Sequence, residues 1–211
     1  MIYKEESKML EKLNPIYFDE IYHLMETSFT PDEYRTYAEQ KALLQLPNYQ
    51  IYGMIDKQNH QVQAFIAIFE FERIVCIDHF AVNPAYRNRG IGSKVLQELM
   101  TMLDKMICLE VELPSDELSQ RRIAFYERNH FFLNPYAYVL PPISKGRKSI
   151  PLYIMTSQRF ITEEEFQTLR QFMYTKLYHQ KDFTTVKDVK NKNFKINEKE
   201  GIAYGIEDKR Y

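Results

Sequence analysis

Several features that define whole classes of proteins are scarce or missing in this sequence. Tryptophan is absent, cysteine occurs twice, and only six of the 211 residues are glycine. Cys76 and Cys108 both lie inside apolar, strand-like segments, and neither belongs to a C-x-x-C pair or a Cys/His cluster. Structural metal sites and redox pairs use clusters of that kind. We therefore expect two buried, reduced thiols in preference to a disulfide or a nucleophile, and no bound metal.

Long apolar segments and an excess of charge are also missing. No stretch approaches the roughly 20 apolar residues of a membrane span, and the first residues lack the basic and apolar regions of a secretion signal. The 28 basic and 29 acidic residues leave a formal net charge of −1, so no overall field attracts nucleic acid or an anionic membrane. The lysine-rich residues 181–200 contain only two aromatic residues, far apart, which supports nucleic-acid binding weakly. We expect a cytoplasmic protein that binds neither membranes nor nucleic acid.

The chain has the length of one large domain, or of one domain with an appendage, and can bury a sizeable core. We expect a domain over residues 1–156, a helix packed on it within residues 157–180, and a polar tail over residues 181–211. The tail is rich in Lys, Asn, Asp and Glu and poor in large apolar residues, so we expect it to be partly ordered at most.

Helix-start signals and a 3.6-residue apolar period predict five helices. Asn14-Pro15, Thr30-Pro31 and Thr162 are the clearest starts, each with a capping residue at the first turn. The last helix should bury the apolar face formed by Phe166, Leu169, Met173 and Leu177. The helices are expected at residues 15–28, 31–44, 93–106 and 116–129, and from 162 onward.

Segments rich in β-branched and aromatic residues predict strands between these helices. Residues 64–69 are apolar without interruption, as in a central strand covered on both faces. Polar residues 56–61 indicate a hairpin turn, and the order of strand, loop, helix and strand over residues 75–113 predicts a right-handed parallel crossover. The fold class is therefore mixed α/β. The strands are expected at residues 49–55, 62–71, 75–82, 106–113, 136–140 and 150–156.

One junction between a strand and a helix has the composition of an anion-binding loop. Residues 87–92, Arg-Asn-Arg-Gly-Ile-Gly, contain two of the six glycines. Backbone N–H groups at a helix start have no intrahelical partner and lie at the positive end of the helix dipole. Glycine lets the backbone approach an anion closely. With Arg87 and Arg89 beside these groups, the loop favours a diphosphate over a single carboxylate.

Two motifs carry a resemblance to a known family. Residues 80–92 resemble the acyl-CoA-binding motif of the GNAT superfamily of N-acyltransferases, with Arg87, Gly90 and Gly92 in its three defined places. Residues 122–131 look like the Arg-x-x-x-Phe-Tyr-Glu signature of that superfamily's fourth helix. One departure is His130, which stands where the family usually has glycine. The resemblance covers roughly residues 15–156.

The resemblance implies a fold and an activity. The fold is a central mixed, mostly antiparallel, twisted sheet of about seven strands, flanked by helices, with a splayed strand pair that binds CoA and a C-terminal extension. The activity is transfer of an acetyl group from acetyl-CoA, the co-substrate, to a primary amine of a small molecule or peptide, by direct attack in a ternary complex. The alternative is an acyl-CoA-binding regulatory or partner-binding module without turnover. The acceptor, the acyl chain and the oligomeric state stay open, and a homodimer is compatible with the sequence.

The resemblance also implies which residues bind the donor. Backbone N–H groups near Ala81 or Val82 would polarise the thioester carbonyl, and Tyr126 would protonate the departing thiolate. Packing of the Tyr126 hydroxyl on a backbone carbonyl is the other interpretation. The residues expected to bind the donor are Phe80, Ala81, Val82, Arg87, Asn88, Arg89, Gly90, Ile91, Gly92, Ser93 and Tyr126.

The base and the acceptor contacts are less defined. Asp78 and Glu112 are the first candidates for a catalytic base, Glu110 shares a strand face with Glu112, and His79 is a further candidate; attack by a neutral amine without a base is also open. The acceptor should lie between the first two helices and the loop joining the last two strands. Glu33, Tyr34 and Tyr37 there would favour a cationic amine, and Lys145 and Arg147 an acceptor with a carboxylate.

Overall fold

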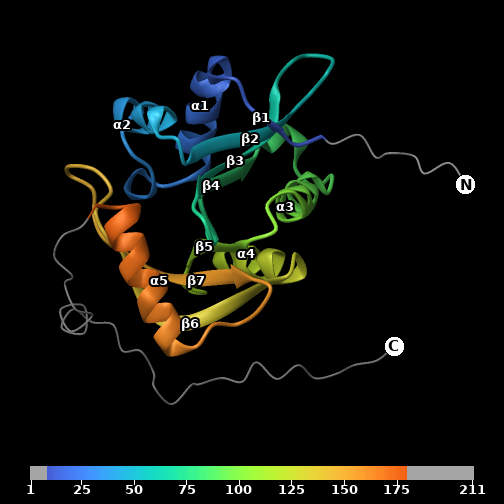
Figure 1. Cartoon of the computed structure of the whole chain (residues 1–211). Coiled ribbons are helices and arrows are strands. Elements are labelled where there is room, and N and C mark those ends of the chain that lie inside the picture. Colours follow the sequence, from blue (N-terminus) through green and yellow to red (C-terminus); the bar gives the residue numbers. More distant parts are fainter. Residues whose placement is uncertain (1–8, 180–211) are drawn as a thin grey trace, which may run out of the picture. The chain divides into compact units, whose positions relative to one another are not determined.

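The computed structural model describes residues 9–179 (Figure 1), so the tail predicted for residues 181–211 lies outside the described residues. Within the described residues, seven strands form one sheet in the order β1-β2-β3-β4-β5-β7-β6. All neighbours are antiparallel except β4 and β5. This confirms the mixed, mostly antiparallel sheet. The strands are β1 (Glu11–Lys12), β2 (Tyr49–Ile55), β3 (Val62–Glu70), β4 (Ile74–Val82), β5 (Met106–Glu112), β6 (Phe131–Leu140) and β7 (Ile150–Ser157).

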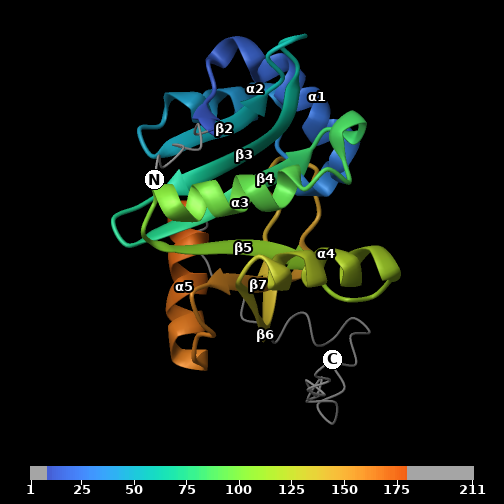
Figure 2. The ribbon, with the colours of Figure 1, turned by 90° about the vertical axis from the view of Figure 1, so that its right-hand side faces the viewer.

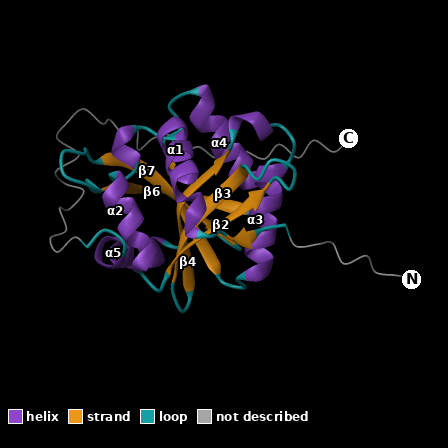
Figure 3. Ribbon diagram, turned by 90° about the horizontal axis from the view of Figure 1, so that it is seen from above, coloured by secondary structure: helices purple, strands orange, loops and turns teal. Residues whose placement is uncertain are grey.

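In the part of the chain that the structure describes, five α-helices flank the sheet. Figure 3 shows the strands between α3 on one side and α2 and α5 on the other. Each of α2, α4 and α5 starts with a capping box, as the polar residues at those positions favour. The helices are α1 (Phe18–Ser28), α2 (Tyr37–Ala42), α3 (Ile91–Met102), α4 (Glu117–Arg128) and α5 (Glu163–Lys176).

Two buried clusters lie on opposite faces of the sheet. One includes side chains of α3 and α4 and the other includes side chains of α1 and α5. Strand β3 lies between them, and its residues 64–68 are fully buried, as predicted for a central strand. Figure 2 shows α3 and α4 on the same face, α3 across β4 and α4 beside β5. The predicted apolar face of α5 is also confirmed as buried.

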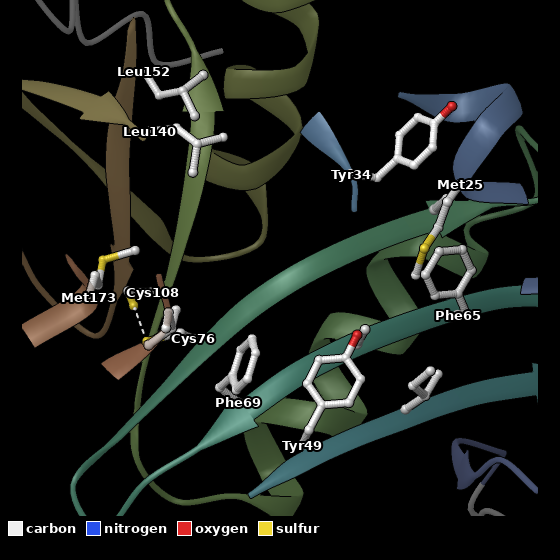
Figure 4. Close-up of a cluster of buried hydrophobic side chains, with 14 of the residues drawn as sticks. Met25, Tyr34, Tyr49, Phe65, Phe69, Cys76, Cys108, Leu140, Leu152 and Met173 are labelled. Carbon is white, nitrogen blue, oxygen red and sulfur yellow. Dashed lines mark hydrogen bonds between the residues drawn. The ribbon is translucent and has the colours of Figure 1, made fainter. Parts of the chain in front are cut away.

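The two cysteines lie side by side in the cluster that α1 and α5 share. Cys76 of β4 is paired in register with Cys108 of β5, and their Sγ atoms are 3.2 Å apart (Figure 4). Both are buried and both are free thiols. The prediction of buried, reduced cysteines is confirmed. The two thiols mark the last paired residues of β4 and β5.

Beyond the cysteines, β4 and β5 separate. Their parallel pairing is confined to Ile74–Cys76 and Met106–Cys108, although β4 continues to Val82 and β5 to Glu112. A bulge in β4 lies at the same place, because Ile77 and His79 face consecutive residues of β3 and leave Asp78 as the extra residue. The parallel crossover through α3 and the splayed pair are both confirmed.

Some predicted boundaries are wrong. The single helix expected over residues 31–44 is broken into a 3₁₀ turn, Pro31–Glu33, and α2, because Tyr34 is extended (φ −133°, ψ 153°) and Thr36 opens a second capping box with Glu39. Strand β6 starts five residues earlier than expected, and its Pro135 lies at an irregularity in the pairing with β7, where an edge strand tolerates a missing N–H.

Two further boundaries differ. Helix α3 starts at Ile91 and ends at Met102, before the predicted residue 106, because a short turn separates it from β5. Strand β1 has no counterpart among the predicted strands, since two residues give no periodic pattern. None of the helices within residues 9–179 combines the length and the apolar character needed to cross a bilayer.

Candidate active site

A cavity of about 520 Å³ occupies the region where β4 and β5 separate. Its walls come from the second half of β4, the loop before α3, one face of α4 and the second half of β5. Every residue predicted for the donor site or for the base lines it, except Arg89. Additional lining residues come from the other end of the cavity: Ser28, Phe29, Glu33, Leu140 and Leu152.

The loop before α3 has the features of an anion site. Gly90 caps the helix with φ 73°, and Asn88 is also left-handed with φ 60°. The backbone N–H groups of residues 89–92 have no hydrogen-bond acceptor among the described residues. These groups lie at the positive end of α3 beside the cavity, so an anion there would satisfy them.

The two glycines of this loop are required for different reasons. At Gly90 a Cβ would meet no atom within 4 Å, so the positive φ is what favours glycine. At Gly92 a Cβ would lie 3.1 Å from the Phe125 ring of α4 and 3.5 Å from Val82. Gly92 therefore allows α3 to pack closely on α4, a reason that the sequence alone did not indicate.

The two arginines of the loop also differ. Arg87 donates from Nε to the Val82 carbonyl oxygen at 3.1 Å, which joins the loop to the end of β4. The Arg89 guanidinium lies 5.5 Å from the centre of the Tyr86 ring and outside the cavity lining. The position of Arg87 therefore supports the predicted contact with the ligand, and the position of Arg89 does not.

Tyr126 reaches the cavity from α4. Its ring packs between Phe125 and Phe131, with centroids 5.3 and 5.8 Å away. The hydroxyl has no hydrogen-bond partner in the part of the chain that the structure describes, so the alternative packing on a carbonyl is not observed. Burial raises the pKa of Tyr126 to about 12, with Arg122 opposing and Glu112 adding to the shift. The phenol is thus protonated at neutral pH and able to donate.

Asp78 is held by four side chains. Its carboxylate accepts hydrogen bonds from Arg35 Nη1 (3.0 Å), Gln40 Nε2 (3.1 Å) and the Tyr49 hydroxyl (3.0 Å), and lies 3.0 Å from His79 Nδ1. Burial alone would raise the pKa of Asp78, but Arg35 and His79 hold it well below its ordinary value. A carboxylate with so low a proton affinity is a poor base, which argues against the role predicted for Asp78.

The remaining carboxylates and His79 have distinct partners. Glu112 forms an ion pair with Arg122, and both side chains are about one-third exposed. Glu110 is half-buried, and its Oε2 accepts a hydrogen bond of 2.6 Å from the Tyr178 hydroxyl. Burial raises the pKa of Glu110. His79 is bonded on both ring nitrogens, to Asp78 and to the Glu33 carbonyl oxygen, as expected of a core histidine.

Comparison with known proteins assigns this arrangement to a family. The model described as "Acetyltransferase (GNAT) family" matches residues 18–131. The chain belongs to the GNAT acetyltransferases. A protein from Bacteroides thetaiotaomicron that is assigned to this family shares 30% sequence identity, with a TM-score of 0.75 over 82% of this chain and 99% of that chain.

Two other solved structures share the GNAT fold. An aminoglycoside 6'-N-acetyltransferase complexed with coenzyme A is 17% identical, with a TM-score of 0.54 over 70% of this chain and 95% of that chain. The ribosomal-protein-S18-alanine N-acetyltransferase from Escherichia coli is 20% identical, with a TM-score of 0.52 over 74% of this chain and 96% of that chain. A comparison with curated protein sequences finds no significant match.

GNAT acetyltransferases use acetyl-CoA as their co-substrate. The unpartnered N–H groups of residues 89–92 suit its diphosphate, and the gap beyond Cys76 leaves room for an extended arm beside β4. His130, the departure from the family pattern, has φ 64°. It therefore adopts the left-handed conformation that glycine would favour, and the turn after α4 is kept.

The loop joining β6 and β7 contacts α2 and the 3₁₀ turn before it. Ser144 donates to Glu39 (2.6 Å) and the Lys148 N–H donates to Asp32 (3.0 Å). Glu33 lines the cavity as predicted. The cavity is not lined by the other residues predicted near the acceptor, which are Tyr34, Tyr37, Lys145 and Arg147. The Arg147 guanidinium lies 5.4 Å from the centre of the buried Tyr34 ring. The Tyr37 hydroxyl donates a hydrogen bond to Asp19.

Proposed function

We propose that this GNAT acetyltransferase transfers the acetyl group of acetyl-CoA to a primary amine of a small molecule or peptide, by direct attack of the amine in a ternary complex. One observation carries the proposal: a single cavity is lined both by the loop before α3, with its open N–H groups, and by Tyr126. An anion anchor and a proton donor are two requirements of acyl transfer from a thioester.

The proposed donor site uses backbone more than side chains. The N–H groups of residues 89–92 bind the diphosphate, and Arg87 stabilises the loop through the Val82 carbonyl. Backbone groups of Ala81 and Val82, on the separated part of β4, bind the arm and polarise the thioester carbonyl. Acetyl-CoA, when bound, supplies the activated acyl group.

Tyr126 is the proposed acid. Its hydroxyl gives its proton to the sulfur as the carbon–sulfur bond breaks. A phenol of pKa about 12 is protonated at neutral pH, so it holds a proton that it can give to the thiolate as the carbon–sulfur bond breaks. The hydroxyl is unbonded in the described residues, so no existing hydrogen bond has to be broken first.

A thiol-release assay with acetyl-CoA and a panel of small amines and peptides tests the function. We expect at least one primary amine to release CoA, with mass spectrometry showing its N-acetylated product in equal amount. Cys76 and Cys108 are buried, but a blank with enzyme and no amine corrects for their reaction with the thiol reagent. Tight acetyl-CoA binding without turnover on any amine would instead support a regulatory acyl-CoA-binding module.

A further inference from the structure

Tyr86 links the loop before α3 to a distant part of the chain. It lies at the end of the 3₁₀ turn Pro84–Tyr86, between β4 and the open N–H groups of residues 89–92. Its side chain is 7% exposed, and it lines the cavity. A polar group buried there needs a hydrogen-bond partner, and Tyr86 finds its partners outside the loop.

The partners of Tyr86 come from the hairpin turn between β2 and β3, residues 56–61. The Tyr86 hydroxyl donates to Asp56 Oδ2 at 3.0 Å and accepts a hydrogen bond from Asn59 Nδ2 at 2.9 Å. The Gln58 N–H donates to the other oxygen of Asp56 at 2.8 Å, which holds the carboxylate in a local turn. The hydroxyl thus both donates and accepts within the hairpin.

The charge of Asp56 strengthens this contact. The Gln58 N–H lowers the pKa of Asp56 most, burial opposes this, and the Tyr86 hydroxyl lowers the pKa further. The carboxylate is therefore ionised at neutral pH, and a hydrogen bond to an ionised acceptor is stronger than one between neutral groups. The hairpin lies outside the motif of residues 80–92, so the motif gives no sign of this contact.

Two further contacts show how the loop is fixed on either side of Tyr86. Before it, the Asn83 N–H donates to the Gln63 carbonyl oxygen at 2.9 Å, and Asn83 Nδ2 donates to the Val62 carbonyl oxygen at 3.1 Å. After it, the Arg89 guanidinium lies 5.5 Å from the centre of the Tyr86 ring. The loop is therefore fixed to β3 at its start and to the hairpin at Tyr86, shortly before the open N–H groups.

We propose that Tyr86 is a positioning residue for acetyl-CoA and that it acts through Asp56. Its hydroxyl fixes the loop on the hairpin, so that the N–H groups of residues 89–92 are held in the arrangement that binds the diphosphate. Donors that are already ordered bind more tightly, because less conformational freedom is lost on binding. The proposal rests on the donor site of the N-acetyltransferase function above, and it extends that site to residues 56–61.

Calorimetric titration of acetyl-CoA into wild type, Tyr86→Phe, Asp56→Asn and the double variant tests the proposal. Tyr86→Phe keeps the ring beside Arg89 and removes the hydroxyl. Asp56→Asn keeps the oxygen that accepts from Gln58 and replaces the other oxygen by an amide nitrogen. We expect each single variant to bind acetyl-CoA about tenfold more weakly, on the scale of one hydrogen bond to a charged group. The double variant should lose no more than either single variant, because both remove the same contact.

Two other readouts separate positioning from a general loss of structure. With the amine found by the thiol-release panel, KM for acetyl-CoA should rise in Tyr86→Phe, while kcat and KM for the amine stay unchanged. In the protein without ligand, the backbone N–H groups of residues 86–92 should exchange hydrogen faster in both single variants, and those of α4 should not. Tyr136→Phe is the matched control. It removes a hydroxyl that bonds to the Ile161 carbonyl oxygen, so affinity and exchange should match wild type.

Three results would overturn the proposal. Wild-type affinity in Tyr86→Phe would show that the hydroxyl does not position the loop. Weaker binding by Tyr86→Phe together with wild-type affinity in Asp56→Asn would show that Tyr86 contacts the ligand directly. Losses that add in the double variant would show that the two residues act separately.

The same titrations distinguish a failure of this proposal from a failure of the proposed function. A wild type that binds no acetyl-CoA would refute the donor site, and the role of Tyr86 with it. A wild type that binds acetyl-CoA but acetylates no amine would refute the N-acetyltransferase function alone. The affinities of Tyr86→Phe and Asp56→Asn would then still decide the role of Tyr86.

Discussion

At the scale of single residues, Tyr126 has an unusual environment for a tyrosine. Its ring lies in the apolar cluster with Phe125 and Phe131, yet its hydroxyl reaches the cavity without a protein partner among the described residues. Because the hydroxyl contributes no hydrogen bond to the fold, its removal should have little effect on stability. Any large effect on turnover would then report chemistry.

Tyr126→Phe should lower kcat by about 100-fold, because the departing thiolate loses its proton donor. Affinity for acetyl-CoA should stay nearly unchanged, since the ring and the loop before α3 are kept. Steady-state kinetics and calorimetric titration of acetyl-CoA measure the two effects, and urea unfolding checks that the fold is intact. A variant as fast as wild type would show that Tyr126 is not the acid.

The residue types of the site could be found from the sequence, but the pairing of the carboxylates could not. Arg35 neutralises Asp78 from 43 positions away, in a segment predicted as helix interior. Glu110 and Glu112 share a strand face, yet one is bonded to a tyrosine beyond α5 and the other to Arg122. Which carboxylate keeps a high proton affinity depends on these tertiary contacts.

At the scale of elements, the contact between Arg35 and Asp78 joins two irregular segments. Arg35 lies in the extended break before α2, and Asp78 is the bulge of β4. The side chains are 8% and 5% exposed. A buried ion pair of this kind fixes the break to the strand at the point where β4 turns away from β5.

Asp78→Asn should lower the free energy of unfolding by about 3–5 kcal/mol at pH 7, because it leaves the Arg35 charge buried and unpaired. The pKa of Asp78 is lowered from its ordinary value of 3.8, so the carboxylate stabilises the fold at pH values above 3.8. This contribution is lost progressively as the pH falls below 3.8. Urea unfolding at pH 7 and pH 3 should show a difference from wild type that shrinks in acid.

Glu112→Gln is the comparison for stability. It breaks an ion pair that is about one-third exposed, so we expect a loss of about 1 kcal/mol or less. Equal losses for the two variants would contradict a structural role for the Arg35–Asp78 contact.

Elements with strong local signals were predicted well. Strand β2 matches its predicted bounds, and α4 and α5 start beside their expected caps. Errors occurred where two signals competed. Thr30 and Thr36 each begin a capping box, and the signal at Thr30 led to one predicted helix across the break between them. Asn134-Pro135 resembles a turn, although it lies within edge strand β6.

At the scale of the whole molecule, the separation of β4 and β5 positions the site. Apolar patterning predicted the strands and the parallel crossover, because each depends on local sequence. The resemblance to the GNAT fold implied about seven strands, but their order, with β7 between β5 and β6, was not predicted, because it depends on pairing between distant segments. Strands β4 and β5 are paired over three residues each, and the remainder of each strand is separated from the other. No sequence pattern specifies where this pairing ends.

Calorimetric titration of acetyl-CoA into wild type, Gly90→Ala and Gly146→Ala tests the central claim most directly. Both glycines have positive φ, and a Cβ added at either would meet no atom within 4 Å, so both variants should lose about 1 kcal/mol of stability. Only Gly90 lies at the N-terminus of α3, where the diphosphate is proposed to bind. We predict that Gly90→Ala weakens acetyl-CoA binding about tenfold or more, and that Gly146→Ala leaves it unchanged. Equal affinity in all three proteins, or no binding by wild type, would contradict the proposed donor site.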